Sequence, residues 1–276
     1  MRVERGGVRG RGAPNLACAG RRARRPTLSP PCSPRSPRHS IAASAVGPID
    51  PDNASILVAG GGGVALAVAR KLKDAGAWVW VLQRSDVRRS EIEGMMAVVV
   101  KGDATNAEDV AKAFAQIEEV DLVVSTIGGT PGDPSADSIG NINLIEAAEK
   151  AGVKKFVLVT SIGCGDSRDA PPAQVFDVLR PVLVEKDKAE ARLREAAGMA
   201  HVIIRPGGLT NEPASGGAAL TADPTVCGAV SREDAATLVA KAALSGAAEN
   251  VTLSLVDRSQ LFARGGADPE FEDFKL

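Results

Sequence analysis

The sequence predicts an α/β fold in which a doubly wound parallel sheet forms a single domain. After residue 51, short apolar runs alternate with segments of helical periodicity, which is the pattern of βαβ units. Most of the apolar runs are continuous, and continuous runs are typical of strands that helices cover on both faces. Four glycines, 60–63, directly follow the first apolar run and indicate a tight turn into the first helix.

The elements follow in chain order from these patterns. The expected strands are 56–59, 78–82, 97–101, 122–126, 156–160, 202–205 and 252–256. The expected helices are 64–75, 107–117, 139–151, 183–197 and 232–244. Two stretches, 166–181 and 211–228, are rich in turn-forming residues and are expected to be loops. Both follow strand ends, where sheets of this kind bind ligands.

The N-terminal stretch has a different composition from the rest of the chain. Its first 45 residues contain ten arginines and one acid, Glu4, together with many Ser, Pro, Gly and Ala. Such leaders are typical of organelle transit peptides. We therefore expect residues 1–48 to be a disordered transit peptide for the chloroplast, with the mitochondrion as the alternative. A basic tail that binds nucleic acid or a membrane surface is the other interpretation.

The remaining chain is acidic. The whole chain has a net charge of −1, and the leader contributes +9, so the body carries about −10. An acidic body without a basic stripe argues against nucleic-acid binding. No apolar run reaches the length of a transmembrane helix. The expected domain is 49–264, and the acidic tail 265–276 with its two phenylalanines is a candidate contact for a protein complex.

The cysteines and the histidine of the body do not indicate a metal site or a catalytic residue. The body holds Cys164 and Cys227, which lack metal-type spacing, and a single histidine, His201. We expect a reducing compartment and no metal site. His201 and Cys164 are interpreted as structural residues rather than catalysts.

The glycine turn carries the clearest functional signal. Gly60, Gly62 and Ala65 fit the dinucleotide fingerprint G-x-G-x-x-G/A. The first glycine permits a sharp turn, the second admits a pyrophosphate, and the small third residue lets the helix pack on the strand. Amides at the helix start would face the phosphates. A Rossmann-like site with Gly60, Gly61, Gly62, Gly63 and Val64 around the pyrophosphate is therefore predicted.

The end of the second strand predicts the choice of nucleotide. An acid there binds a ribose 2′-hydroxyl, whereas an arginine accommodates a 2′-phosphate. Gln83 and Arg84 occupy this strand end, and the first acid, Asp86, follows only three residues after Gln83. The pattern favours NADP(H) over NAD(H). A solvated loop position for Arg84 is the alternative.

Two further strand ends are candidate cofactor contacts. Asp103 and Ala104 follow the third strand and are expected to flank the adenine, although Asp103 also suits a turn or a helix cap. Thr126, Ile127 and Gly128 follow the fourth strand, where a glycine leaves space for a ribose. A simple turn is the alternative at this second position.

Several segments together resemble one family, the atypical short-chain dehydrogenase/reductases, and in particular their NAD(P)H-binding, NmrA-like branch of plastids and bacteria. The matching segments are 57–60 (LVAG), 102–104 (GDA), 143–148 (NLIEAA), 151–163 (AGVKKFVLVTSIG), 185–190 (EKDKAE), 203–209 (IIRPGGL) and 230–236 (VSREDAA). They span residues 54 to 257 in the family's order. The turn departs from the family form G-A-T-G-x-x-G because it is one residue shorter and consists of glycine alone.

The resemblance implies a catalytic set from which one member is absent. The family uses a serine, a tyrosine that donates a proton, and a lysine that holds the nicotinamide ribose. Ser161 and Lys186 match the serine and the lysine, whereas Val182 stands at the tyrosine position and the chain contains no tyrosine. The segment 205–208, with Pro206 and Gly207, is implied to lie beside the nicotinamide.

The missing acid decides between substrates. A general acid contributes typically about 10²–10⁴-fold, so reduction of simple ketones is not expected. Conjugated acceptors of the flavin, quinone or bilin type delocalise the negative charge that the hydride brings, so they depend less on protonation by a general acid. Related flavin and biliverdin reductases work without that tyrosine. The sequence therefore predicts an NADPH-dependent reductase of a small conjugated acceptor. The alternative is a non-catalytic NADP(H)-binding scaffold or redox-sensing subunit of a plastid complex.

Overall fold

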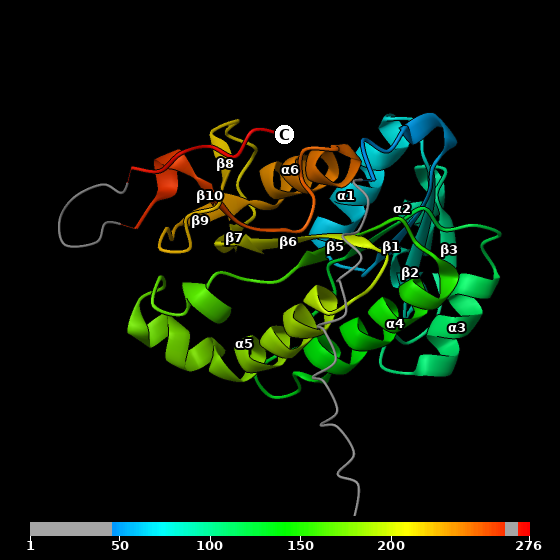
Figure 1. The fold of residues 1–276 in the computed structure, drawn as a ribbon, viewed down its shortest axis with the longest axis horizontal. Helices are drawn as coiled ribbons and strands as arrows, with labels where there is room; N and C mark the ends of the chain where they lie inside the picture. The colour runs from blue at the N-terminus through cyan, green and yellow to red at the C-terminus, as the bar shows by residue number, and fades with distance from the viewer. Residues whose placement is uncertain (1–45, 263–269) are drawn as a thin grey trace, which may run out of the picture. The chain divides into compact units, whose positions relative to one another are not determined.

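The computed structural model describes residues 46–262 and 270–276. The strands of this part of the chain are β1 (Ser55–Ala59), β2 (Trp78–Gln83), β3 (Val98–Lys101), β4 (Leu122–Ser125), β5 (Lys155–Val159), β6 (Ala200–Pro206), β7 (Gly208–Thr210), β8 (Ala218–Thr221), β9 (Ala229–Ser231) and β10 (Val251–Asp257). The α-helices are α1 (Gly63–Asp74), α2 (Arg89–Gly94), α3 (Ala107–Ala115), α4 (Asn141–Ala151), α5 (Ala173–Arg194) and α6 (Arg232–Leu244) (Figure 1).

The main sheet has the doubly wound order that the sequence predicts. Its eight strands lie in the order β3-β2-β1-β4-β5-β6-β10-β8, and all neighbours are parallel except the pair β10 and β8. The strand order reverses between β1 and β4, because the chain builds outward first on one side and then on the other. Sheets of this kind form a ligand crevice at that switch point, beyond the carboxyl ends of the strands.

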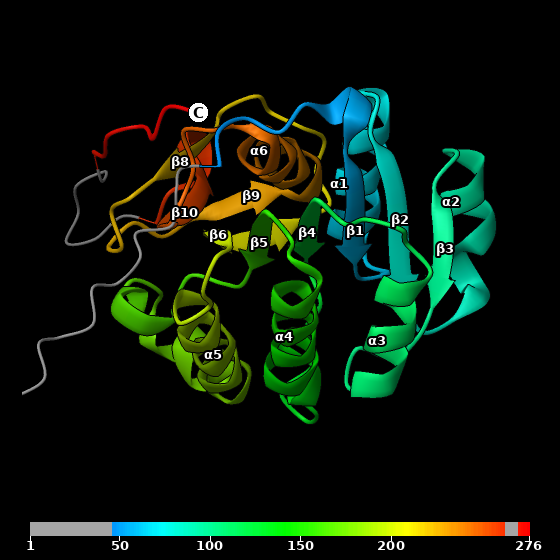
Figure 2. The ribbon, with the colours of Figure 1, turned by 45° about the vertical axis from the view of Figure 1, so that its right-hand side comes forward.

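Helices cover both faces of the sheet. Figure 2 has α3, α4 and α5 on one face and α1 and α6 on the other. Along β5, Phe156 and Leu158 enter the core under the first group, whereas Val157 and Val159 enter the core under the second. Both faces of the strand are therefore buried, which explains why its sequence is continuously apolar.

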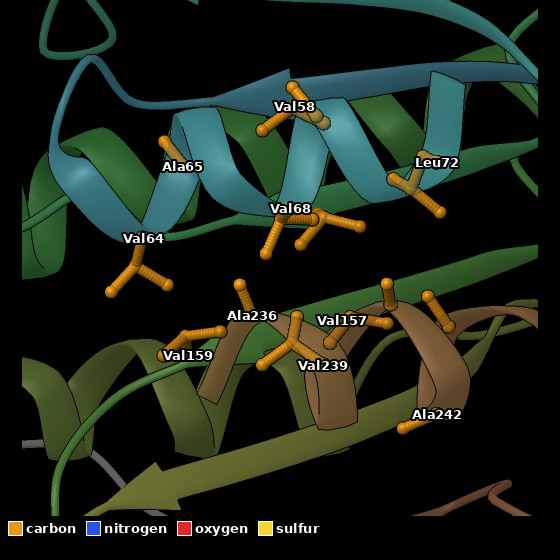
Figure 3. Packing of buried hydrophobic residues seen from close by; sticks show 14 of the residues in the cluster. Val58, Val64, Ala65, Val68, Leu72, Val157, Val159, Ala236, Val239 and Ala242 are labelled. Carbon is orange, nitrogen blue, oxygen red and sulfur yellow. The ribbon is translucent and has the colours of Figure 1, made fainter. Parts of the chain in front are cut away.

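The contact between α1 and α6 holds the glycine turn in position. Val64, Val68 and Leu72 of α1 point toward Ala236 and Val239 of α6, and β5 valines lie beside them (Figure 3). The spacing of the α1 residues places them on one helical face. Because α6 presents small side chains here, the two helices pack closely and the start of α6 comes near the start of α1.

The expected loop 166–181 was wrong in its second half. Helix α5 begins at Ala173, ten residues before the expected start, and Pro181 lies inside it. An internal proline removes one backbone hydrogen bond and usually ends a helix. Here Val182, Leu183 and Leu193 are buried, so packing holds the helix beyond the proline. The short elements α2, β7, β8 and β9 were missed, and β8 lies within the expected loop 211–228.

The remaining boundaries agree within a few residues. The expected helix 139–151 begins as a π-helical turn, Ala136–Gly140, and continues as α4. No helix among residues 46–262 and 270–276 is long and apolar enough to cross a membrane. Residues 1–45 and 263–269 lie outside the described residues, so the transit peptide and most of the domain boundaries stay predictions. At the C-terminus, Phe274 N donates to Leu220 O of β8 at 2.7 Å.

Candidate nucleotide and active site

The glycine turn has the geometry that a dinucleotide site requires. Gly60 adopts φ +134°, and a Cβ there would lie 2.6 Å from Thr126 Oγ1, so this position admits only glycine. Gly62 is the N-cap of α1 and has no side-chain cap, and a Cβ there would meet nothing within 4 Å. The first amides of α1 have no partner within the helix and face this open space.

A cavity of 480 Å³ lies at the carboxyl ends of β1 to β4. Nine of the predicted cofactor residues line it: Gly60, Gly61, Gly62, Arg84, Asp103, Ala104, Thr126, Ile127 and Gly128. The crevice therefore forms where the strand order reverses, as the topology requires. Gly63 and Gly207 line neither this cavity nor the second one described below. A Cβ on Gly207 would lie 2.2 Å from Gly228 O, so that glycine serves backbone packing.

The charges of the cavity wall that follows β2 are mostly positive. Asp86 accepts from Lys101 at 2.7 Å and from Arg89 at 3.2 Å, and these two hydrogen bonds lower the pKa of Asp86. That acid is therefore engaged by cations outside the cavity wall. Arg84 and Arg88 line the cavity, and the Arg84 side chain is 70% exposed with its Nη1 4.0 Å from Asp103 Oδ2. An anionic group bound here would meet two arginines.

Asp103 has the turn-forming role that was one of its two alternatives. Its Oδ1 accepts from Thr105 N at 2.9 Å and from Thr105 Oγ1 at 2.8 Å. The hydrogen bond from the Thr105 amide is the main cause of a lowered pKa of Asp103, and the Thr105 hydroxyl adds to it. Because the residue also lines the cavity, the turn presents Asp103 and Ala104 to a ligand.

Gln83 is a cavity residue that was not predicted as a cofactor contact from the sequence. It is 6% exposed, lines the cavity, and its Nε2 is buried without a hydrogen-bond partner among the described residues. A buried amide donor without an acceptor is costly, and a ligand oxygen would satisfy it. The signal in the sequence was its place at the end of β2, where this fold contacts the ribose. The orphaned donor and the open space at Gly62 both fit a dinucleotide.

A second cavity, of 260 Å³, brings the two predicted catalytic residues together. Ser161 and Lys186 line it with Val182. The rest of the wall is mainly apolar: Val64, Thr126, Val159, Thr160, Leu179, Leu183, Pro206 and Leu209. Thr126 lines both cavities, so the apolar cavity begins where the nucleotide crevice ends. Ser161 Oγ donates to Ile162 O at 3.0 Å.

Lys186 forms a buried ion pair that the sequence did not reveal. Its Nζ lies 2.8 Å from Oδ1 of Asp137, whose side chain is fully buried. Asp137 Oδ2 accepts from Gly129 N at 2.9 Å. Asp137 belongs to the π-helical turn before α4, far from Lys186 in sequence, and no spacing rule links the two. The acid fixes the ammonium group at the wall of the apolar cavity.

Two neighbouring groups are excluded from the chemistry. Cys164 is fully buried, and burial raises its pKa, so the thiol does not ionise near neutral pH. Arg205, in the segment implied to lie beside the nicotinamide, instead turns into the protein and pairs with Glu190 at 2.6 Å and with Asp166. Among the described residues, no group of three or more His, Cys, Asp or Glu side chains could hold a metal ion.

Comparison with known proteins agrees with this geometry. The sequence matches the NAD(P)H-binding family over residues 60–245, which is more than half of the chain. The chain belongs to this family of atypical short-chain dehydrogenase/reductases. The match covers the glycine turn, both cavities and all of α6.

Three similar proteins illustrate the relationship. An uncharacterized chloroplastic protein of Arabidopsis thaliana, At2g34460, is 30% identical over 182 residues, which are 62% of this chain and 64% of that protein. The chloroplastic protein TIC 62 of Pisum sativum is 31% identical over 115 residues, which are 40% of this chain and 21% of that protein. The chain thus spans less than two thirds of these relatives. ChuY, an anaerobilin reductase from Escherichia coli O157:H7, has a solved structure with a TM-score of 0.65, 27% identity and coverage of 78% of this chain and 100% of ChuY.

Proposed function

We propose that the protein is an NADPH-dependent reductase of a small conjugated acceptor of the flavin, quinone or bilin type. The observation that carries the proposal is the apolar cavity beside the nucleotide crevice. Ser161 and Lys186 line this cavity, and an apolar side chain, Val182, replaces the usual acid. Such a cavity suits a flat ring system that accepts a hydride without a strong proton donor.

The charges of the crevice support NADPH over NADH. Arg84 and Arg88 line the adenine end, and the nearby acid Asp86 is bound by Lys101 and Arg89. A 2′-phosphate would find two arginines there, and Asp103, the acid on the same wall, accepts from Thr105 with one oxygen and faces Arg84 with the other. A charge-assisted hydrogen bond contributes about 1.5–3 kcal/mol, which corresponds to roughly ten- to a hundredfold in affinity.

Different residues would bind different parts of the dinucleotide. Gly60 to Gly62 and the first amides of α1 would hold the pyrophosphate, and Gln83 would donate to an oxygen of the adenine ribose. Lys186, fixed by Asp137, would hold the nicotinamide ribose. When bound, the nucleotide supplies the hydride for the acceptor.

Proton delivery explains the expected choice of acceptor. Four side chains with N–H or O–H groups line the cavity: Ser161, Lys186, Thr126 and Thr160. The Thr126 hydroxyl donates to Ala59 O and the Thr160 hydroxyl to Glu190, Lys186 pairs with Asp137, and Val182 offers no proton. A conjugated ring spreads the developing negative charge, so water or Ser161 suffices to protonate it. An isolated ketone needs a proton at its oxygen as the hydride arrives. The bilin class is further supported by the similarity to ChuY.

An acceptor screen tests the proposal. NADPH oxidation is followed with menadione, flavin mononucleotide, biliverdin and cyclohexanone under anaerobic conditions. We expect turnover with at least one of the three conjugated compounds and none with cyclohexanone. Robust reduction of cyclohexanone would contradict the proposal, because no acid stands at residue 182.

A second candidate is a non-catalytic NADP(H)-binding scaffold or redox-sensing subunit of a plastid complex. The ion pair between Lys186 and Asp137 agrees with it, because a lysine held by a buried carboxylate can bind a ribose without taking part in catalysis. The similarity to TIC 62 and the packed acidic residues 270–276 also agree with a partner-binding role. Tight NADPH binding without turnover of any acceptor, together with co-purification in a large plastid complex, would favour this candidate over the reductase.

A plastid location is part of the proposal. The arginine-rich, acid-poor leader and the chloroplastic relatives support import and removal of roughly the first 48 residues. Mass spectrometry of the protein from its native source tests this directly. Peptides that cover residues 21–38 in the mature protein would refute it, and a mitochondrial fraction would favour the alternative organelle.

A further inference from the structure

Arg232 uses only its Nη1 group for hydrogen bonds to the described residues, which is two of its five N–H donors. It is the first residue of α6 and is partly buried. Its Nη1 donates to Asn211 Oδ1 at 2.7 Å and to Leu209 O at 3.3 Å. The edge formed by Nε and Nη2 has no acceptor among the described residues, and no carboxylate among them pairs with this arginine. That free edge is the one that binds carboxylate or phosphate in a bidentate way.

Arg232 lies beside the start of α1 and is not among the lining residues of either cavity. Its Cδ and Nε lie 3.1 Å and 3.8 Å from the position that a Cβ of Gly63 would occupy. Gly63 begins α1, and the next residue, Val64, lines the apolar cavity together with Leu209. The Arg232 side chain therefore packs against the start of α1, at the end of the glycine turn.

The neighbouring acids are directed elsewhere. Glu233 pairs with Lys71 at 2.7 Å. Asp234 accepts from Ser231 Oγ at 2.9 Å and from Ser215 N at 2.7 Å. The two acids in its first turn compensate the positive end of α6, whereas α1 has no acid in its first turn. The uncompensated start of α1 and the Arg232 side chain lie side by side, which favours an anion at this place. Asn211 and the Leu209 carbonyl fix the orientation of the guanidinium group before any ligand arrives.

We propose that Arg232 binds an anionic group of the ligand through its Nε–Nη2 edge, and that residue 63 is glycine because a side chain there would displace this arginine. The shared chemistry is a pair of anionic oxygens. They come either from the nicotinamide-side phosphate of the dinucleotide or from a carboxylate of the acceptor. The second source rests on the proposed function, whereas the first requires only nucleotide binding.

Calorimetry with two nucleotides tests the phosphate source. NADPH carries both phosphates of the pyrophosphate bridge, whereas adenosine 2′,5′-bisphosphate lacks the nicotinamide-side phosphate. Arg232→Gln should weaken NADPH binding by about ten- to a hundredfold, the range for a charge-assisted contact, and leave the bisphosphate unchanged. Arg70→Gln is the matched control, because Arg70 is an exposed arginine of α1 that pairs with Glu91 at 3.5 Å, and it should change neither affinity.

Spectroscopic titration of biliverdin tests the acceptor source without requiring turnover. The protein, saturated with NADP⁺, is titrated with biliverdin, which carries two carboxylates, and with its dimethyl ester. If the acceptor is the source, Arg232→Gln weakens biliverdin binding about ten- to a hundredfold, leaves the ester unchanged and leaves NADPH unchanged. Both experiments measure binding and not turnover. A protein that reduces no acceptor would therefore contradict the proposed reductase function and leave the proposal for Arg232 unaffected.

The proposal fails if Arg232→Gln changes neither NADPH nor biliverdin binding. It also fails if NADPH and the bisphosphate weaken equally, because the effect would then be a general loss of structure. Should Arg232→Gln fold poorly, Gly63→Ala gives the second test. The added methyl group should push the arginine aside and weaken the same ligand as Arg232→Gln, with a smaller factor. An unchanged affinity in Gly63→Ala would contradict the role assigned to Gly63.

Discussion

Two neighbouring glycines of the turn should respond to substitution in opposite ways. Gly62 has φ −83° and ψ 175°, which any residue adopts, and a Cβ there meets nothing within 4 Å. Gly60 has φ +134°, and a Cβ there would lie 2.6 Å from Thr126 Oγ1. Gly62→Val should therefore remove nucleotide binding from a folded protein, whereas Gly60→Ala should destabilise the fold itself.

The magnitudes follow from these local geometries. At Gly62, the loss of a favourable N-cap residue costs about 1 kcal/mol, and the smaller entropy of the unfolded chain offsets about 0.4–1 kcal/mol. The net change in the free energy of unfolding is therefore within about 1 kcal/mol. At Gly60, the positive φ alone costs about 1–3 kcal/mol, and the contact with Thr126 adds to it. For Gly62→Val, the loss of two charge-assisted hydrogen bonds to the pyrophosphate corresponds to roughly 10²–10⁴-fold in NADPH affinity.

Two measurements on each variant check this reasoning. Urea unfolding followed by circular dichroism gives the free energy of unfolding, and calorimetry gives the NADPH affinity. Normal NADPH binding by a folded Gly62→Val protein would refute the assignment of the pyrophosphate to this turn. A Gly60→Ala protein as stable as wild type would refute the argument from its backbone conformation.

Three further substitutions probe the charges around the site. Arg84→Ala should reduce the preference for NADPH over NADH by roughly ten- to a hundredfold, measured by calorimetry with both nucleotides, and equal wild-type affinities would contradict the preference. Asp137→Asn should destabilise the fold by about 3 kcal/mol in urea unfolding, because it leaves the Lys186 ammonium buried without its partner, and the double variant with Lys186→Met should be more stable than Asp137→Asn alone. Burial lowers the pKa of Lys155 from 10.5 to about 8, so the unfolded state binds more protons between these values and stability rises with pH there. Relative to Lys155→Met, the free energy of unfolding of wild type should rise by up to about 1.4 kcal/mol per pH unit in that window, and a constant difference between the two proteins would refute the shift.

The core strands and the glycine turn could be predicted because their signals are local. In β5, each residue from Lys155 to Val159 is buried, and this two-sided burial leaves a continuous apolar run in the sequence. Gly60 and Gly62 are two residues apart along the chain, and the turn they make depends mainly on their own backbone freedom. For such features the cause and its sequence signature lie within a few residues.

The missed features depend on contacts between distant parts of the chain. Helix α5 continues through Pro181 because residues beyond the proline are buried against the sheet, and no local pattern reports this. Asp137 meets Lys186 across the fold, and Arg232 reaches Gly63 only because α1 and α6 pack side by side. Ser161 and Lys186 were found through the family resemblance rather than through spacing, and the structure brings both to one cavity.

The most direct test of the proposed reductase is a single turnover with isotopically labelled NADPH. The protein is loaded with one equivalent of NADPH, either unlabelled or deuterated at the transferable position, and mixed anaerobically with the best acceptor of the screen. We expect the nicotinamide absorbance to be lost in one phase, more slowly for the deuterated nucleotide, and the label to appear in the reduced acceptor. A bound nucleotide that is never oxidised by menadione, flavin mononucleotide or biliverdin would contradict the account and favour the non-catalytic candidate.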